Sequence, residues 1–474
     1  ATTARGPVVA MRSTLRQLQV PPGKSIAYEG NASFGGIGLP PPQQGDAPHT
    51  YSGYLSGMLD YTGFVTRGNY AGTPLAVSPR FGLVAGVQRY RAGEVLFVNL
   101  PLGYLKGRTD ALPMHGFLGY FVHRMLQSAS LSPMPDGVPG LMLNWHLDSS
   151  TAQEPSLALE KLGVFDAGPF SIHMTAGPDT IQPGDGRGWN LDHNPVAQDL
   201  LRRLKAKGHD MGNHGGWIHD YYGLRATEEN RKSFLPYLEL NRESVERIVG
   251  PSRSYSAPLG NNPMWSMDWL DRRGVRAVYS LGHTGLGPTR QYRDGMLRNP
   301  RMVMIPVTSL GLYATFEEFQ SRGVPPDEVR AWYRELVDFC RDNDTARMVY
   351  LHPPGAARWP DVVQDLLSHV AAQGPRLRWY SMDQLAQALL QRVDVRWGQE
   401  VDAQGLVRFE AVHTHGLKGL VWRLPKSRYQ RPVITGGGSV EDGGSHWLVR
   451  APPDKTLRFQ AQLSALPMRH PGNG

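Results

Sequence analysis

Two histidines that enclose a pair of glycines are the residues of this sequence best suited to chemistry. His214 and His219 are five residues apart, and the intervening Gly215 and Gly216 let the chain bend so that both rings reach one point. Neutral imidazoles are common ligands of zinc and related divalent ions. The spacing therefore predicts a metal site, with surface or helix-capping histidines as the alternative.

The residues next to this pair have predicted roles of their own. Asp210 and Asp220 lie on either side of it, and one of these carboxylates is expected to orient an imidazole ring by accepting its second N–H. His209 stands just before the pair, between a glycine and an aspartate. We expect His209 to be a surface or helix-capping residue and not a ligand.

Four further segments place polar or turn-forming residues after predicted strands. Asp148 follows the strand predicted for residues 141–146, where it is either functional or the cap of the next helix. His352 leaves a buried strand into a Pro-Pro-Gly turn, which would hold it where it can donate a proton. The loops at residues 175–179 and 255–260 are the other two, and each segment alone is also explained by turn chemistry.

The scaffold that must position these residues alternates strands with helices over about 250 residues. The alternation predicts a parallel (β/α) barrel or a doubly wound sheet, with its chemistry at the carboxyl ends of the strands. The predicted strands are residues 141–146, 169–173, 211–214, 275–280, 302–305, 347–351 and 377–380. The predicted helices are residues 194–207, 228–249, 327–340, 362–372 and 381–391.

Taken in order, these segments resemble the polysaccharide deacetylases of the NodB-homology type, carbohydrate esterase family 4. The resemblance rests on Asp148 after the first strand and on the segments GHDMGNHGGWIH, YSAPLG and LHPPG, and it covers residues 139–392. It implies an α/β fold, a distorted (β/α) barrel of the NodB-homology type. It also implies a metal-dependent hydrolase that removes N-acetyl groups from a polysaccharide or related glycan, placed outside the cytoplasm.

On the matching positions, the resemblance implies that Asp148, His214 and His219 bind a divalent metal ion, most often zinc, and that His352 is the catalytic acid. The sequence departs from the family pattern in three places. One acid follows the first strand in place of two, the histidines are five apart in place of four, and the family's arginine falls on Ser256. Asp148 is therefore expected to be catalytic, either as a metal ligand or as the base.

These departures leave alternatives to a polysaccharide deacetylase. One is a catalytically inactive barrel that binds glycan, and another is an amide hydrolase that acts on a small substrate. If Asp148 is a ligand, Asp179 or Asp220 is expected to help activate water. Four tryptophans are expected either to stack on sugar faces or to pack in the core, namely Trp145, Trp189, Trp217 and Trp359.

Composition narrows the class of protein further. The 474 residues carry a net charge of +8, but Lys and Arg are scattered, which disfavours a nucleic-acid partner. No apolar run is long enough for a transmembrane helix. Cys340 is the single cysteine, so no internal disulfide can form, and we expect it to be buried and inert.

Two flanking regions differ from the barrel. Residues 1–130 are predicted to form an α/β domain, with a strand at 93–100 and a helix at 109–127, but without a full set of strands. Residues 128–140 have the composition of a linker. Residues 393–474 are predicted to form a small all-β, sandwich-like domain with strands at 407–412, 419–423, 445–450 and 456–463.

Overall fold

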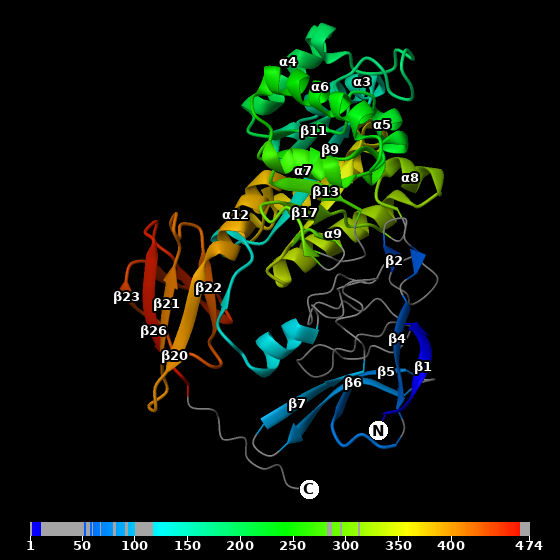
Figure 1. The fold of residues 1–474 in the computed structure, drawn as a ribbon. Helices are drawn as coiled ribbons and strands as arrows, with labels where there is room; N and C mark the ends of the chain where they lie inside the picture. Colours follow the sequence, from blue (N-terminus) through cyan, green and yellow to red (C-terminus); the bar gives the residue numbers. More distant parts are fainter. Residues whose placement is uncertain are drawn as a thin grey trace.

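The structure is a computed structural model. It describes residues 2–10, 52–53, 57–58, 60–66, 68–78, 82–90, 93–99, 117–281, 287–293, 296–310 and 313–464. Figure 1 shows a helix-covered barrel, a group of β-strands beside helix α12, and a further group of strands from the first hundred residues. No helix in the described part of the chain is long and apolar enough to cross a membrane.

Seven parallel strands form the barrel, which confirms the (β/α) barrel over the doubly wound sheet. Their order is β17-β13-β12-β11-β10-β9-β18, and a parallel bridge between Val307 and Met348 closes the ring between β17 and β18. The strands are β9 (Gly140–Leu147), β10 (Ser171–Met174), β11 (Asp210–His214), β12 (Ser254–Ser256), β13 (Ala277–Ser280), β17 (Val303–Pro306) and β18 (Ala346–Leu351).

The barrel is distorted around β9, its longest strand. One edge of β9 pairs with β18 along most of its length. Its other edge pairs first with β19 (Arg378–Tyr380) and then, from Asn144 onward, with β10. A short antiparallel strand, β14 (Thr289–Arg290), extends the sheet beyond β17. Strand β9, the first strand of the barrel, therefore pairs with the last two strands, β18 and β19, as well as with β10.

Helices cover the outside of this barrel (Figure 1). Two of them begin at caps that the sequence carries: Asn194 accepts a hydrogen bond from the backbone N–H of Ala197, and Ser381 forms a capping box with Gln384. The five predicted helices are confirmed as α4 (Pro195–Ala206), α6 (Arg231–Val249), α9 (Pro326–Asp342), α11 (Pro360–Ala371) and α12 (Met382–Asp394). The sequence analysis missed α3 (Gln153–Lys161), α5 (His219–Arg225), α7 (Met264–Arg272), α8 (Phe316–Ser321) and α10 (Pro353–Arg358).

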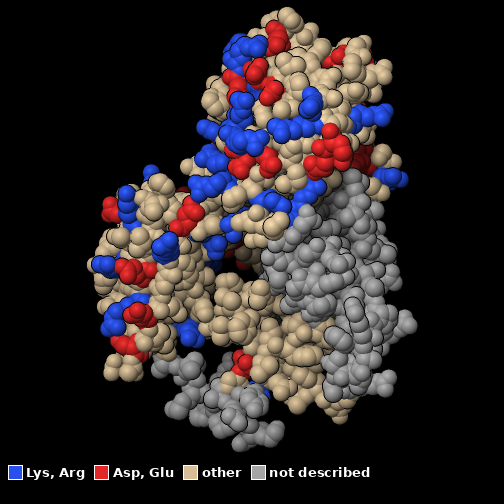
Figure 2. Space-filling model, in the orientation of Figure 1, with Lys and Arg blue, Asp and Glu red and all other residues tan. Residues whose placement is uncertain are grey.

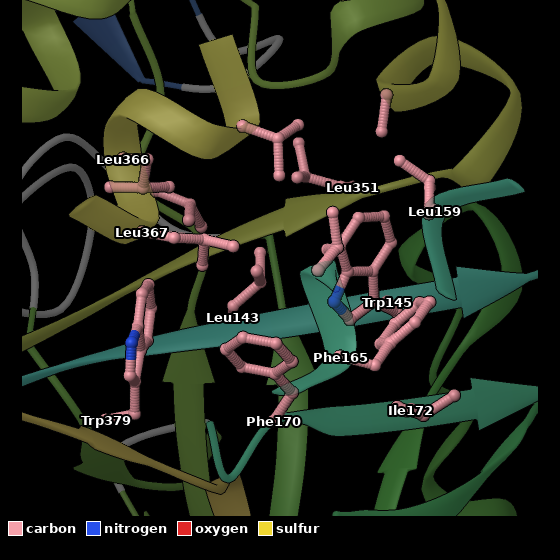
Figure 3. Packing of buried hydrophobic residues seen from close by; sticks show 14 of the residues in the cluster. Leu143, Trp145, Leu159, Phe165, Phe170, Ile172, Leu351, Leu366, Leu367 and Trp379 are labelled. Atoms are coloured by element: carbon pink, nitrogen blue, oxygen red, sulfur yellow. The ribbon is translucent and has the colours of Figure 1, made fainter. Parts of the chain in front are cut away.

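The main hydrophobic core lies between the strands and these helices. Leu143 and Trp145 of β9 point into it and pack near Phe165, Phe170 and Leu367 (Figure 3). Burying side chains of this size contributes about 1.5–3 kcal/mol each. Of the four tryptophans considered for sugar stacking, Trp145 and Trp189 are fully buried core residues, and Trp217 and Trp359 are partly buried against the same cluster.

Three single-residue expectations have clear outcomes. His209 is not a surface residue: it is buried, its Nδ1 accepts from the Phe170 N–H at 3.0 Å and its Nε2 lies 3.0 Å from the Phe165 carbonyl oxygen. Cys340 is buried as predicted, and burial raises the pKa of its thiol to about 12. The apolar period of residues 194–207 also predicts that Val196 lies on the buried side of that helix, but Val196 is 45% exposed and Ala197 takes the buried position.

The C-terminal residues form an all-β unit, as predicted. One sheet has the order β20-β21-β26-β23 and the other β24-β25-β22-β8. Strand β8 (Ser130–Leu131) comes from the stretch predicted to be a linker and pairs with β22 through Leu131 and Trp422. The strands are β20 (Arg396–Val401), β21 (Leu406–Val412), β22 (Val421–Pro425), β23 (Val433–Gly436), β24 (Ser439–Asp442), β25 (His446–Arg450) and β26 (Thr456–Gln462).

The described residues before the barrel form antiparallel strands followed by a short helical segment. Strands β5 (Thr73–Ser78), β6 (Gly82–Tyr90) and β7 (Gly93–Val98) form one sheet. Strand β7 confirms the strand predicted at residues 93–100. Strands β1 (Thr2–Ala10) and β4 (Asp60–Thr66) pair separately, as do the two-residue strands β2 (Ser52–Gly53) and β3 (Gly57–Met58). Residues 109–116 of the predicted helix lie outside the described residues, and residues 117–125 are helical.

Charged side chains mix on the face of the molecule drawn in Figure 2. Lys and Arg are interspersed with Asp and Glu over the barrel and over the C-terminal sheets. Several of them form ion pairs, such as Arg203 with Glu160 at 2.7 Å. This pattern agrees with the scattered charge of the sequence.

We predict that Asn241 of α6 is a main stabilising contact of the barrel. Its side chain accepts from the Ala176 N–H at 2.7 Å and donates to the Met174 carbonyl at 3.0 Å, and it is fully buried. Asn241→Leu should lower the free energy of unfolding by about 2–4 kcal/mol, because each buried backbone group left unpaired costs about 1–3 kcal/mol. Urea denaturation measures this, and Leu240→Ala, at a side chain 45% exposed, is the matched control. Equal unfolding midpoints for the two variants would contradict the assignment.

Candidate metal centre

The carboxyl ends of the barrel strands bring the predicted site residues together. Asp148 follows β9, His214 ends β11, Ser256 ends β12 and His352 follows β18. Because all these strands are parallel, their carboxyl ends meet at one end of the barrel. The alternation of β9 turns Trp145 outward to the core and, two residues apart on the other face, His146 and Asp148 inward.

His214, His219 and Asp148 converge on one point. The Nε2 atoms of the two rings are 3.0 Å apart. Asp148 Oδ1 lies 2.9 Å from His214 Nε2 and 3.6 Å from His219 Nε2. His214 and His219 come from one local segment, and the barrel brings Asp148, which follows a different strand, to both of them.

The outer nitrogens of both rings fix where the lone pairs point. His214 Nδ1 lies 3.0 Å from the Ser256 carbonyl oxygen, and His219 Nδ1 lies 2.7 Å from Asp220 Oδ1. Both partners can only accept, so each Nδ1 carries the proton and each Nε2 presents a lone pair. Two lone pairs and a carboxylate oxygen thus face one another, an arrangement that a cation between them would relieve.

The donor set and its spacing fit a divalent ion. Metal–ligand bonds of about 2.0–2.2 Å place neighbouring ligand atoms about 3–3.5 Å apart, close to the three separations observed. Asp148 Oδ1 is buried and receives no hydrogen bond in the described structure, as expected of a ligand atom. His146 also offers a nitrogen within 4.8 Å of the ligand atoms of Asp148 and His214.

The protonation states favour metal binding. Burial alone would raise the pKa of Asp148, but the adjacent rings of His219, His352 and His214 hold it well below its usual value. Burial is the main cause that lowers the pKa of His214. An ionised carboxylate beside a neutral imidazole is the form in which these groups bind metals.

His352 lies on the other side of Asp148 and is held by a second carboxylate. Its Nε2 is 3.4 Å from Asp148 Oδ2 and its Nδ1 is 3.4 Å from Glu317 Oε2. Burial would lower the pKa of His352, but Asp148 and Glu317 outweigh it and raise the pKa to about 9. The two carboxylates therefore favour the protonated form of His352. Gly355 leaves room for Glu317, since a Cβ there would lie 2.4 Å from its carboxylate.

Sequence reasoning missed Glu317 and a set of polar residues inside the barrel. Glu317 lies in the first turn of α8, 35 residues before His352, and nothing local marks it as the partner of His352. Asn144 and His146 share the two-residue period of Asp148, but a polar residue within a predicted strand gives no sign of its own that it is more than scaffold. The same holds for His173 of β10.

Three expected helper residues have different outcomes. Asp220 contacts His219, as one alternative expected. Asp210 lies at the amino end of β11 and accepts from Ser171 Oγ at 3.2 Å, away from the two ligand histidines. Asp179 accepts from the backbone N–H groups of Gly184 and Gly186, both at 2.8 Å, and so shapes its own loop.

No family model matches the chain, and no curated protein matches it. Solved structures match about half of it. A Mycobacterium smegmatis protein described as a polysaccharide deacetylase is 17% identical, with a TM-score of 0.40, over 55% of this chain and 93% of that one. A peptidoglycan deacetylase of Bacillus subtilis is 12% identical, with a TM-score of 0.34, over 55% and 96%.

A third match is a mutant of a pseudoenzyme of carbohydrate esterase family 4, 14% identical with a TM-score of 0.29, over 54% of this chain and 72% of that one. Over about half of its length, the chain is similar to polysaccharide deacetylases of carbohydrate esterase family 4 and diverges from them in sequence.

Proposed function

We propose that this protein is a metal-dependent hydrolase that removes N-acetyl groups from a polysaccharide or a related glycan. One observation carries the proposal: the lone pairs of His214 and His219 meet Asp148 Oδ1 at ligand spacing, beside His352. The order of the motifs along the sequence, which resembles that of the family 4 deacetylases, supports the acetyl group and the glycan as substrate.

Asp148, His214 and His219 are the proposed metal ligands, and the two-histidine, one-carboxylate set suits zinc. Such an ion, when bound, polarises a carbonyl group and lowers the pKa of water toward neutrality. Asp148 Oδ1 faces the two histidines and its Oδ2 faces His352. This division favours the ligand role of Asp148 over the role of base.

His352 is the proposed catalytic acid. Hydrolysis of an N-acetyl group adds water to the amide carbonyl carbon and breaks the bond from that carbon to nitrogen. The departing nitrogen needs a proton, and His352 carries one on Nε2, on the side of Asp148. Glu317 accepts from the other N–H of the ring, so it fixes the ring and stabilises its charge.

A second candidate is a barrel that binds glycan without turnover. Among the described residues, Asp148 is the one carboxylate that contacts both ligand histidines and His352. A hydrolase whose base is separate from its metal ligand would need a second carboxylate there, so this arrangement favours the inactive barrel. Acetate release from a panel of N-acetylated glycans separates the two candidates. Zinc-dependent release supports the hydrolase, and glycan binding without release supports the inactive barrel.

We predict that Asp148→Asn lowers zinc content and acetate release together. Loss of a group that only orients a metal ligand weakens metal binding by about 10–100-fold. Removing the charge of a ligand itself should therefore weaken zinc binding by at least about that factor. Mass spectrometry of the purified variant gives the metal stoichiometry. Full zinc content with lost activity would instead assign Asp148 as the base, and full content with full activity would remove it from both roles.

We predict that Glu317→Gln lowers kcat while zinc content stays at the wild-type level. The amide cannot stabilise the positive charge of protonated His352, so His352 should donate its proton less readily. A catalytic acid contributes about 10²–10⁴-fold to the rate, and we expect kcat to fall by about 10-fold or more. His352→Gln should show the larger loss. Asp361→Asn, at an exposed carboxylate of α11, is the control. Unchanged kcat in Glu317→Gln would contradict the role given to Glu317.

A further inference from the structure

Neutral polar side chains fill the interior of the barrel beneath the metal centre, and Ser256 is their common contact. Its carbonyl oxygen holds His214 Nδ1. Its Oγ lies 2.5 Å from His173 Nδ1, 2.9 Å from Asn144 Nδ2 and 3.1 Å from His146 Nε2. All five residues are at most 3% exposed, so none of these groups exchanges its partner for bulk water.

His173 bridges two hydroxyls of one strand. Its Nε2 lies 2.9 Å from Ser254 Oγ, and its Nδ1 contacts Ser256 Oγ. Ser254 and Ser256 are alternate residues of β12, so both point into the barrel. Because each ring nitrogen contacts one hydroxyl, the imidazole holds strand β12 at two points, Ser254 and Ser256. That segment carries the carbonyl oxygen that orients His214.

Strand β11, which lies between β10 and β12, leaves space for the His173 ring. It passes His173 at Gly212. A Cβ at Gly212 would lie 2.2 Å from His173 Cδ2 and 2.7 Å from Ser254 Oγ. A side chain at this position would therefore displace the bridge, which explains why glycine stands two residues before a metal ligand.

We propose that His173 is a positioning residue for the metal ligand His214 and acts through Ser256. The proposal rests on the proposed function, because it gives a support to the centre proposed there. Groups that orient a ligand from outside the coordination shell change metal affinity by about 10–100-fold when they are removed. A buried histidine that only packs in the core would change stability and leave metal affinity as it was.

His209 provides a matched control within the same barrel. It is also a buried histidine of a strand-flanking position with both ring nitrogens hydrogen-bonded, but to the Phe165 carbonyl and the Phe170 N–H. It has no hydrogen bond to Ser256 or to a proposed ligand in the described structure. His173→Phe and His209→Phe each keep a ring and delete both hydrogen bonds, so they differ in what the lost bonds support.

The experiment is a titration of metal-free variants of the whole 474-residue chain with Zn²⁺ in competition with a chelator, with circular dichroism as the check of folding. We expect a Zn²⁺ Kd about 10-fold or more weaker than wild type for His173→Phe, and a Kd within threefold of wild type for His209→Phe. If His173→Phe does not fold, Ser256→Ala carries the same expectation, because it keeps the carbonyl and deletes the hydroxyl.

A folded His173→Phe or Ser256→Ala variant with wild-type Kd would overturn this inference and leave the proposed function standing. Equal weakening in His173→Phe and His209→Phe would also overturn it, since general loosening of the barrel would then explain both. A wild-type protein that binds no Zn²⁺ would overturn the metal centre and this inference together. Zinc binding without acetate release would remove the proposed function and leave the support by His173 in place.

Discussion

The two-residue period of strand β9 is the constraint on which the rest of this structure depends. Its outward residues, Leu143 and Trp145 among them, anchor the main hydrophobic cluster. Its inward residues, Asn144 and His146, continue into Asp148 and define the polar interior and the centre. A shift of register by one residue would exchange these two sets. The stability of the barrel and the placement of its chemistry therefore depend on one pairing scheme.

The sequence predicted the elements with strong local signals and missed those that depend on distant contacts. The 3.6-residue period and the Ser381 cap predicted α12, and the apolar run before Asp148 predicted β9. Short helices such as α8 carry too few residues for a period to emerge. The sequence predicts His209 at the surface or in a helix cap, whereas tertiary packing against Phe170 buries it.

The candidate site divides in the same way. His214, His219, Asp148 and His352 follow strands and stand beside turn residues, which makes them visible in a single sequence. Glu317 contacts His352 only because the tertiary fold brings the first turn of α8 to the end of β18. The interior residues were hidden for another reason. A histidine within a short apolar strand reads as part of the scaffold, and nothing in one strand tells which hydroxyls of another strand it meets.

Strand β8 gives the C-terminal β unit an unusual relation to the barrel. The chain passes through this unit once before β9, at Ser130–Leu131, and returns to it after α12. The two ends of the barrel are thus fastened to one partner, and Arg392 of α12 adds hydrogen bonds to the Leu131 carbonyl. A single cut or fusion point cannot separate the two units cleanly. Recombination that moves the β unit to another protein must carry both flanks of the barrel, so the two units are expected to be inherited together.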